Sequence, residues 1–334
     1  MRIGYPCVNE AMDCSAANTF RLASYSEERL LAAVAANLAC VRRLLEWNVA
    51  QGLLFLRLGS GIVPFGSHAV NTFAWQQHFS ADFRQIGDYI KANNLRVSFH
   101  PDQFVVLNSP STDIVQRSIE ELVYQGSMFD LMGLDSTAKL QIHVGGLYND
   151  RELALSRFAT VFDTLPAAVK RRVVVENDDR LFSLRDCLRL HALTGVPILF
   201  DNFHHECLSH GEPMPEALRL AASTWHPTHD GVPMMDYSSQ APDERKGKHA
   251  ASLVETRFRE FLDNLHGLDF DIMLEIKDKE ASALRAVDIL REHRLVPAAP
   301  SGPAPPLTLP PDPSTPAAKT ARRRPQTVSP AGNA

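Results

Sequence analysis

The chain has 334 residues, of which 45% are hydrophobic and 22% are charged, so it can bury a large core as one α/β barrel or as two smaller domains. It contains no run of about eighteen uncharged apolar residues, which argues against a membrane span. The formal net charge of −5 argues mildly against a nucleic-acid partner, although three bound divalent cations would add six positive charges and bring it to +1.

Short apolar segments alternate along the chain with longer amphipathic ones. The strand-like segments are RIGYPCV (2–8), LLFLRLG (53–59), RVSFHP (96–101), KLQIHVG (139–145), RVVVEND (172–178), PILFDNF (197–203), MMDYSS (234–239) and DIMLEIK (271–277). Apolar residues at helical spacing predict helices over 27–47, 80–93, 112–133, 151–165, 183–193, 213–222, 251–265 and 279–293.

Eight strand–helix units in about 290 residues determine the expected fold class. Strands that are apolar on both faces and separated by helices are typical of a parallel sheet covered by helices. An open, doubly wound sheet binds its ligand at one switch point, whereas a barrel gathers residues from the ends of all its strands. The candidate functional residues come from nearly every unit, which favours a (β/α)8 TIM barrel over residues 1–293.

The composition changes abruptly near Pro297. Residues 297–334 are rich in Pro, Ala, Ser and Thr and carry a short basic patch, Lys319 with Arg322 to Arg324. Such a segment buries too little apolar surface to fold, so we expect a disordered tail. The basic patch adds at most weak affinity for DNA.

The five cysteines form an odd, scattered set without a CxxC pair, and they are Cys7, Cys14, Cys40, Cys187 and Cys207. This usage predicts free thiols in a reducing compartment. The N-terminal segment lacks the apolar core of a secretory signal peptide. We therefore expect a cytoplasmic protein.

Acidic and imidazole side chains fall at the ends of the predicted strands. They are His100, His143, Glu176, Asp201, His204, Asp236 and Glu275, with His68 and His249 in the connections after the second and seventh strands. A lone strand-end His or Asp is usually a hydrogen-bonded or helix-capping residue. Nine of them at the rim where a barrel gathers its strand ends point instead to an active site.

Carboxylates buried close together need compensating positive charge, which divalent cations supply. Imidazole combined with carboxylate suits Zn, Mn or Fe, and nine ligands exceed the capacity of one ion. The pattern thus predicts two or three ions. Clusters of this kind typically hydrolyse phosphodiesters.

Seven segments give the chain a resemblance to a known family: GYPCVN, SFHPDQFVVLNSP, IHVGG, VENDD, DNFHH, DYSSQ and EIKDKE. They are similar to those of the UV damage endonuclease family. The resemblance implies a TIM barrel related to endonuclease IV, with up to three metal ions, manganese first and zinc, cobalt or magnesium as alternatives. It also implies incision of damaged double-stranded DNA immediately 5′ to UV photoproducts and other lesions, which leaves a 3′-hydroxyl and a 5′-phosphate. We expect a monomer associated with the nucleoid.

The resemblance also implies roles for single residues. The family's metal ligands correspond to His68, His100, His143, Glu176, Asp201, His204, His249 and Glu275, and His100, His143, Glu176 and Glu275 are expected to be catalytic. The seventh strand departs from the family. Relatives have a Lys–x–His pair where this chain has Met234–Met235–Asp236. Asp236 can ligate a metal through oxygen, whereas Met234 cannot replace a lysine that bridges metals.

Recognition of damage is expected from a second set of residues. Tyr5, Asn9, Gln103 and Phe104 match the positions at which the family probes the duplex at the lesion. Polar and aromatic side chains can fill the gap left by poorly stacked nucleotides. Lys277, two residues after Glu275, is a candidate phosphate contact.

Three alternatives stay open at the level of sequence. An abasic-site endonuclease without UV preference would use the same chemistry, and a sugar isomerase or epimerase would use one or two metals on the same barrel. A catalytically silent DNA-binding protein is the third. An isomerase would leave irradiated DNA intact, and metal analysis would separate the silent protein from the enzymes.

Overall fold

Eight parallel strands close into a barrel in the computed structural model, which describes residues 1–293 and 295. The strands pair in sequence order, and β8 returns to β1. They are β1 (Ile3–Pro6), β2 (Phe55–Leu58), β3 (Arg96–Phe99), β4 (Lys139–His143), β5 (Val173–Glu176), β6 (Ile198–Asp201), β7 (Met234–Tyr237) and β8 (Asp271–Leu274). The predicted TIM barrel is confirmed, and the tail expected over 297–334 lies outside the described residues.

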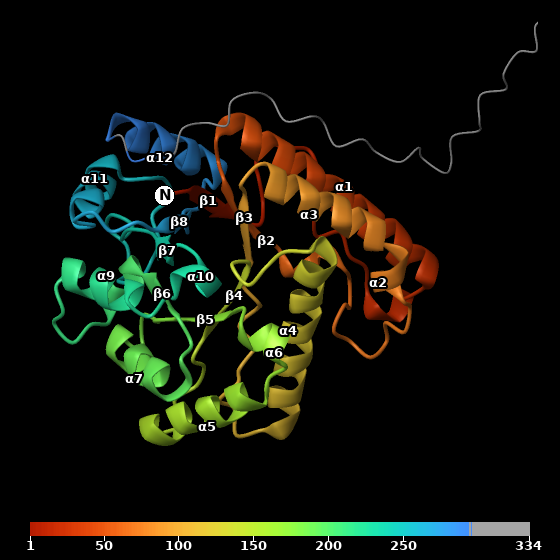
Figure 1. Cartoon of the computed structure of the whole chain (residues 1–334), viewed down its shortest axis with the longest axis horizontal. Helices are drawn as coiled ribbons and strands as arrows, with labels where there is room; N and C mark the ends of the chain where they lie inside the picture. Colours follow the sequence, from red (N-terminus) through yellow and green to blue (C-terminus); the bar gives the residue numbers. More distant parts are fainter. Residues whose placement is uncertain (294, 296–334) are drawn as a thin grey trace, which may run out of the picture.

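Helices surround the strands on the outside of the barrel (Figure 1). The longer ones are α1 (Glu27–Gln51), α3 (Ser80–Ala92), α4 (Thr112–Met132), α5 (Arg151–Thr164), α7 (Leu184–Thr194), α9 (Met214–Ala222), α11 (Glu255–Asp263) and α12 (Glu280–Glu292). Short helical segments lie between them: α2 (Trp75–His78), α6 (Ala167–Lys170), α8 (Asn202–Cys207) and α10 (Pro227–Asp230). Each of the eight predicted helical patterns thus corresponds to one long helix.

Local sequence signals explain where the helices begin and end. The Ser26 hydroxyl accepts a hydrogen bond from the Arg29 backbone N–H and so caps α1. Ser183 and Asp186 form a reciprocal capping box at the start of α7. Gly52, with φ of 76°, ends α1 in the left-handed conformation that only glycine adopts without cost.

The barrel interior is built in two layers by the alternation of residues along the strands. A buried apolar cluster contains one residue from each of five strands, Phe55, Val174, Leu199, Met234 and Met273, together with Trp225. The residues two positions further along the same strands are Arg57, Glu176, Asp201, Asp236 and Glu275. Because side chains two apart share a face of a strand, this second set also points inward. We call the apolar layer the apolar floor, and the polar residues form the rim of the barrel directly above it.

The opposite end of the barrel is closed by a buried ion-pair group. The Asp271 carboxylate accepts hydrogen bonds from the Arg2 backbone N–H at 2.9 Å, from Arg2 Nη1 at 2.8 Å and from Arg96 Nη1 at 2.9 Å. Burial lowers the pKa of Arg96, and Asp271 acts in the opposite direction. One carboxylate thus joins β8, β3 and the start of β1.

The prediction of five free thiols is wrong for two of the cysteines. Cys14, in the loop after β1, and Cys40, on α1, form a disulfide across 26 residues of sequence. The loop and the helix lie against each other here, since Asn37 of α1 also accepts a hydrogen bond from the Asn18 backbone N–H at 2.7 Å. Cys7, Cys187 and Cys207 are free. Among the described residues, none of the helices is long and apolar enough to cross a membrane.

Candidate metal centre

The carboxyl ends of the strands carry the residues that sequence analysis singled out. Seven of the nine predicted ligands form three overlapping groups whose ligand atoms lie within 4.8 Å of one another. The groups are His100 with His143 and Glu176, Glu176 with Asp201 and His204, and Asp201 with Asp236 and Glu275. Six of the seven lie at the ends of the consecutive strands β3 to β8 or directly after them, and His204 lies in α8, the short helix that follows β6.

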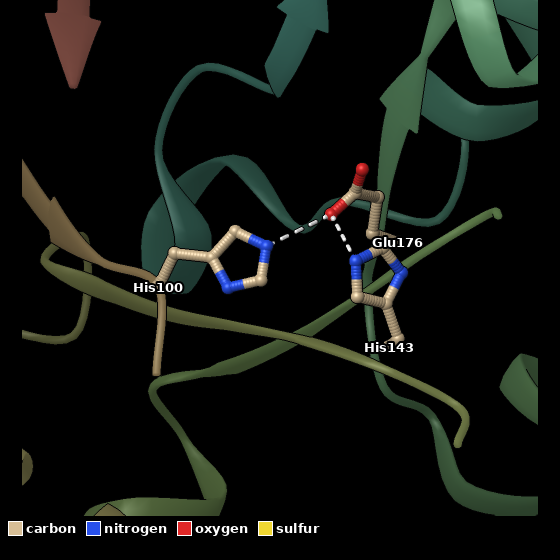
Figure 2. A group of neighbouring side chains, drawn as sticks. All are labelled: His100, His143 and Glu176. Atoms are coloured by element: carbon tan, nitrogen blue, oxygen red, sulfur yellow. Dashed lines mark ion pairs between the residues drawn. The ribbon is translucent and has the colours of Figure 1, made fainter. Parts of the chain in front are cut away.

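Glu176 is the centre of the first two groups. Its Oε2 lies 3.4 Å from His100 Nε2 and 3.4 Å from His143 Nε2, and its Oε1 lies 3.1 Å from His204 Nδ1. Figure 2 shows the rings of His100 and His143 directed at the same carboxylate oxygen from neighbouring strands. The Glu176 side chain is 1% exposed. A buried carboxylate that faces three imidazoles is suited to bridge two cations.

Asp201 combines a structural role with an open ligand position. Its Oδ1 accepts a hydrogen bond from the His204 backbone N–H at 2.7 Å, which caps α8 and brings His204 toward Glu176. Its Oδ2 is buried and has no hydrogen-bond partner among the described residues, and the same holds for His143 Nδ1. His204 Nδ1 lies 3.7 Å from Asp201 Oδ2, which is too far for a hydrogen bond. A buried carboxylate oxygen without a hydrogen bond is costly unless another group, such as a cation, binds it.

The electrostatics of the site show an excess of negative charge. Burial alone would raise the pKa of Glu176, but His143, His100 and His204 outweigh it and hold that pKa well below its ordinary value. Burial raises the pKa of Asp201 well above its ordinary value, with Glu176, Asp236 and Glu275 adding to the effect. Burial likewise raises the pKa of Asp236 to about 7, against the opposing effect of Arg57. Bound divalent cations would relieve this repulsion, so the donor set fits them.

Arg57 and Gln141 belong to the site but were missed in the sequence. Arg57 Nη2 donates to both carboxylate oxygens of Asp236, at 2.6 and 2.8 Å, and to Gln141 Oε1 at 2.7 Å. Arg57 Nη1 donates to Glu275. Gln141 Nε2 in turn donates to Glu176 at 2.6 Å and to Asp236 at 2.7 Å. The available signal was position, because Arg57 follows the inward-facing Phe55 by two residues.

His249 and His68 lie apart from the three groups. The ring of His249 is 6.2 Å from that of His204, and its Nδ1 is 2.9 Å from the Glu275 carbonyl oxygen. His68 is exposed in the loop after β2, where its Nδ1 accepts a hydrogen bond from the Val70 backbone N–H at 3.0 Å. Their roles as ligands remain predictions.

The residues expected to probe DNA differ in exposure. Phe104 is 53% exposed, and Gln103 lines a cleft of about 510 Å³ together with His100, His143 and His204. Tyr5 and Asn9 are buried. Asn9 Nδ2 donates to the Tyr5 hydroxyl at 2.9 Å, and that hydroxyl donates to Asn48 Oδ1 at 2.7 Å. Contact of Tyr5 or Asn9 with a nucleotide would require these hydrogen bonds to rearrange, and their role at the lesion stays a prediction.

Basic side chains gather on the other side of the centre. Arg245, Lys248, Lys277 and Lys279 line a cleft of about 590 Å³ that also contains His249 and Glu275. Lys277 is exposed. The predicted phosphate contact thus lies beside a predicted metal ligand, within a group of cations.

The chain is similar to a family of known proteins over most of its length. Residues 1–302 match the family model described as UV-endonuclease UvdE. A UV DNA damage endonuclease of Clostridium perfringens is 35% identical over 87% of this chain and 71% of its own length, and one from Bacillus cereus is 32% identical over 88% of this chain and 96% of its own.

Solved structures agree on the fold. The crystal structure of SacUVDE matches with a TM-score of 0.84 and 44% identity, over 88% of this chain and 99% of that one. Endonuclease IV from Thermus thermophilus (TM-score 0.54, 15% identity, 87% of this chain and 98% of that one) shares the fold alone. D-psicose 3-epimerase from Clostridium cellulolyticum likewise shares only the fold, with a TM-score of 0.52 and 11% identity over 87% of this chain and 99% of that one. With the family model spanning the whole barrel, the chain belongs to the UV-endonuclease UvdE family.

Proposed function

We propose that the chain is a metal-dependent DNA repair endonuclease that hydrolyses the phosphodiester immediately 5′ to UV photoproducts and other distorting lesions. The products are a 3′-hydroxyl and a 5′-phosphate. The observation that carries the proposal is the Glu176 carboxylate, buried at the rim of a barrel of this family and faced by three imidazoles. As a repair enzyme it would act as a monomer on the nucleoid, in the cytoplasm.

The residues that would hold the ions are those of the three groups, together with His249 and His68 from the loops. His100, His143 and Glu176 form one set of ligands, and Glu176, Asp201 and His204 form the next. Divalent ions bound there, manganese first, supply Lewis-acid activation of water and neutralise charge on the phosphate. Zinc, cobalt and magnesium are the alternatives to manganese.

The protein's own contribution is to hold these side chains in place before substrate arrives. Gln141 fixes the Glu176 carboxylate through a hydrogen bond of 2.6 Å, and Arg57 fixes Glu275 and Asp236. The His204 Nδ1 lies 2.9 Å from the Asn177 carbonyl oxygen, which orients that ring. We assign the catalytic contacts to His100, His143, Glu176 and Glu275.

Damaged duplex is engaged, on this proposal, from two sides of the centre. The exposed Phe104 and Gln103 enter the gap beside the lesion, where stacking is already weak and eversion costs least. Lys277 and its basic neighbours contact the backbone phosphates. Tyr5 and Asn9 are assigned to the same contact with the lesion, which requires the hydrogen bond between Tyr5 and Asn48 to rearrange.

A defined oligonucleotide duplex tests the proposed function. With Mn²⁺, a duplex that carries one cyclobutane dimer should be nicked immediately 5′ to it, and EDTA should stop the reaction. Mapping of the product ends should show a 3′-hydroxyl and a 5′-phosphate. Nicking of an abasic duplex but not of the dimer would favour the abasic-site alternative. An intact dimer duplex combined with turnover of a ketose would favour the sugar epimerase.

Replacing Phe104 and replacing Lys277 with alanine should have different effects on DNA binding. Phe104→Ala removes the exposed ring, so preference for damaged over intact duplex should fall on the order of tenfold, because stacking on one base contributes roughly 1–3 kcal/mol. Lys277→Ala should instead weaken binding to both duplexes equally and make it less salt-dependent. Binding measured by fluorescence anisotropy at several salt concentrations separates the two. Equal loss of lesion preference in both variants would contradict the assignment.

A further inference from the structure

The third group of candidate ligands differs from the other two because it already contains a cation. Asp201, Asp236 and Glu275 are close enough to share an ion, but the Arg57 guanidinium contacts two of the three carboxylates. It pairs with both oxygens of Asp236 and with one oxygen of Glu275. An arginine stays protonated even when it is buried, so this positive charge is permanent.

Arg57 is buried inside the barrel and does not lie on its surface. Its side chain is 3% exposed and follows Phe55 of the apolar floor by two residues on β2. Gln141 holds it from the side by accepting a hydrogen bond from Nη2 at 2.7 Å, and the same Gln141 amide donates to Asp236 and Glu176. These contacts fix the guanidinium at one place beside β7 and β8.

The remaining two groups hold no such charge. In the part of the chain that the structure describes, their five side chains form no hydrogen bond or ion pair with an arginine or lysine, and they are His100, His143, Glu176, Asp201 and His204. Asp201 Oδ2 and His143 Nδ1 are the buried atoms without hydrogen-bond partners there. Below Asp236, strand β7 offers only Met234, which packs in the apolar floor. A divalent ion beside Asp236 would have to share a buried space with the guanidinium, and like charges repel strongly in such a space.

We infer that Arg57 is a resident cation of the metal centre, so that the protein binds two divalent ions and Asp236 serves Arg57 instead of a metal. The inference rests on the proposed metal-dependent function and refines it. Arg57 is a positioning residue here, because it acts on Glu275 and, through Gln141, on Glu176. The sequence-based expectation of two or three ions narrows to two.

The test is the number of Mn²⁺ ions bound per full-length chain, measured by titration calorimetry and by elemental analysis after dialysis. The wild type should bind two. Arg57→Met removes the charge but keeps an unbranched side chain, so it should bind three, whereas Arg57→Lys keeps the charge and should still bind two. The wild-type count alone decides the matter if Arg57→Met does not fold. Three ions on the wild type, or two on a folded Arg57→Met, would overturn the inference.

Asp236 and Asp201 provide a matched pair on neighbouring strands. Asp236→Asn should still bind two ions, because its carboxylate serves the guanidinium, whereas Asp201→Asn should lose one. Loss of an ion in Asp236→Asn would overturn the inference. A wild type that binds no ion and nicks dimer-bearing DNA without one would refute the proposed metal dependence as well, so the two failures are distinguishable.

Discussion

Replacing Glu176 with glutamine should reduce nicking of a dimer-bearing duplex on the order of 10³-fold. The change keeps the shape of the side chain but removes the negative charge that His100, His143 and His204 face. Because Glu176 belongs to two of the three ligand groups, its loss should weaken both. The variant should show this as a lower content of bound Mn²⁺ and as a lower single-turnover rate at saturating enzyme.

A distant glutamate on the surface provides the control. Glu120 is exposed on α4, so Glu120→Gln should retain wild-type nicking and metal content. Both variants should have wild-type circular dichroism spectra, since each substitution keeps the shape of the side chain and leaves the backbone pairing of Glu176 with His143 and Leu199 unchanged. Wild-type nicking by Glu176→Gln would show that the catalytic centre lies elsewhere.

Replacing Asp271 with alanine should unfold the protein more easily and leave the chemistry intact. The change leaves Arg96 buried without its carboxylate and removes the link between β8, β3 and the chain before β1. Loss of one partner from a buried ion pair costs about 3–5 kcal/mol, which corresponds to a fall in melting temperature of roughly 10 °C. Calorimetry measures the fall, and nicking at about 20 °C, where the variant is folded, should be close to that of the wild type.

Asp269 is the matched control, two residues earlier. It is 58% exposed and pairs only with the N-terminal amine, at 2.9 Å, among the residues that the structure describes. Asp269→Ala should lower the melting temperature by no more than a few degrees, because exposed ion pairs contribute about 0–1 kcal/mol. A similarly small fall in melting temperature in both variants would mean that the stability of the barrel does not depend on the Asp271 ion pairs.

The spacing of residues in the sequence was enough to predict the barrel and the grouping of its strand-end side chains. Eight apolar segments separated by helical patterns favour a parallel sheet, and the rim of a closed parallel sheet brings all strand ends together. His100, His143, Glu176, Asp201, His204, Asp236 and Glu275 could be identified because each is a polar residue at the end of an apolar run. Their location required no knowledge of side-chain contacts.

Contacts that depend on packing could not be predicted in this way. Arg57 lies within a strand and resembles a residue that extends to solvent, until its pairing with Asp236, 179 residues away, is known. Side chains two apart in a strand face the same side, so Arg57 faces inward with Phe55. The sequence alone did not show that Phe55 faces inward. Tyr5 also could not be recognised as buried, because its partner Asn48 comes from the end of α1. The disulfide between Cys14 and Cys40 was also missed, because the spacing of the five cysteines in the sequence does not show which of them pair.

Anomalous diffraction from crystals grown with Mn²⁺ tests the shared metal centre most directly. Manganese peaks should lie within coordination distance of the Glu176 carboxylate, one of them also beside His100 and His143 and another beside Asp201 and His204. Peaks confined to other parts of the molecule, with these side chains still bonded only to one another, would contradict the account.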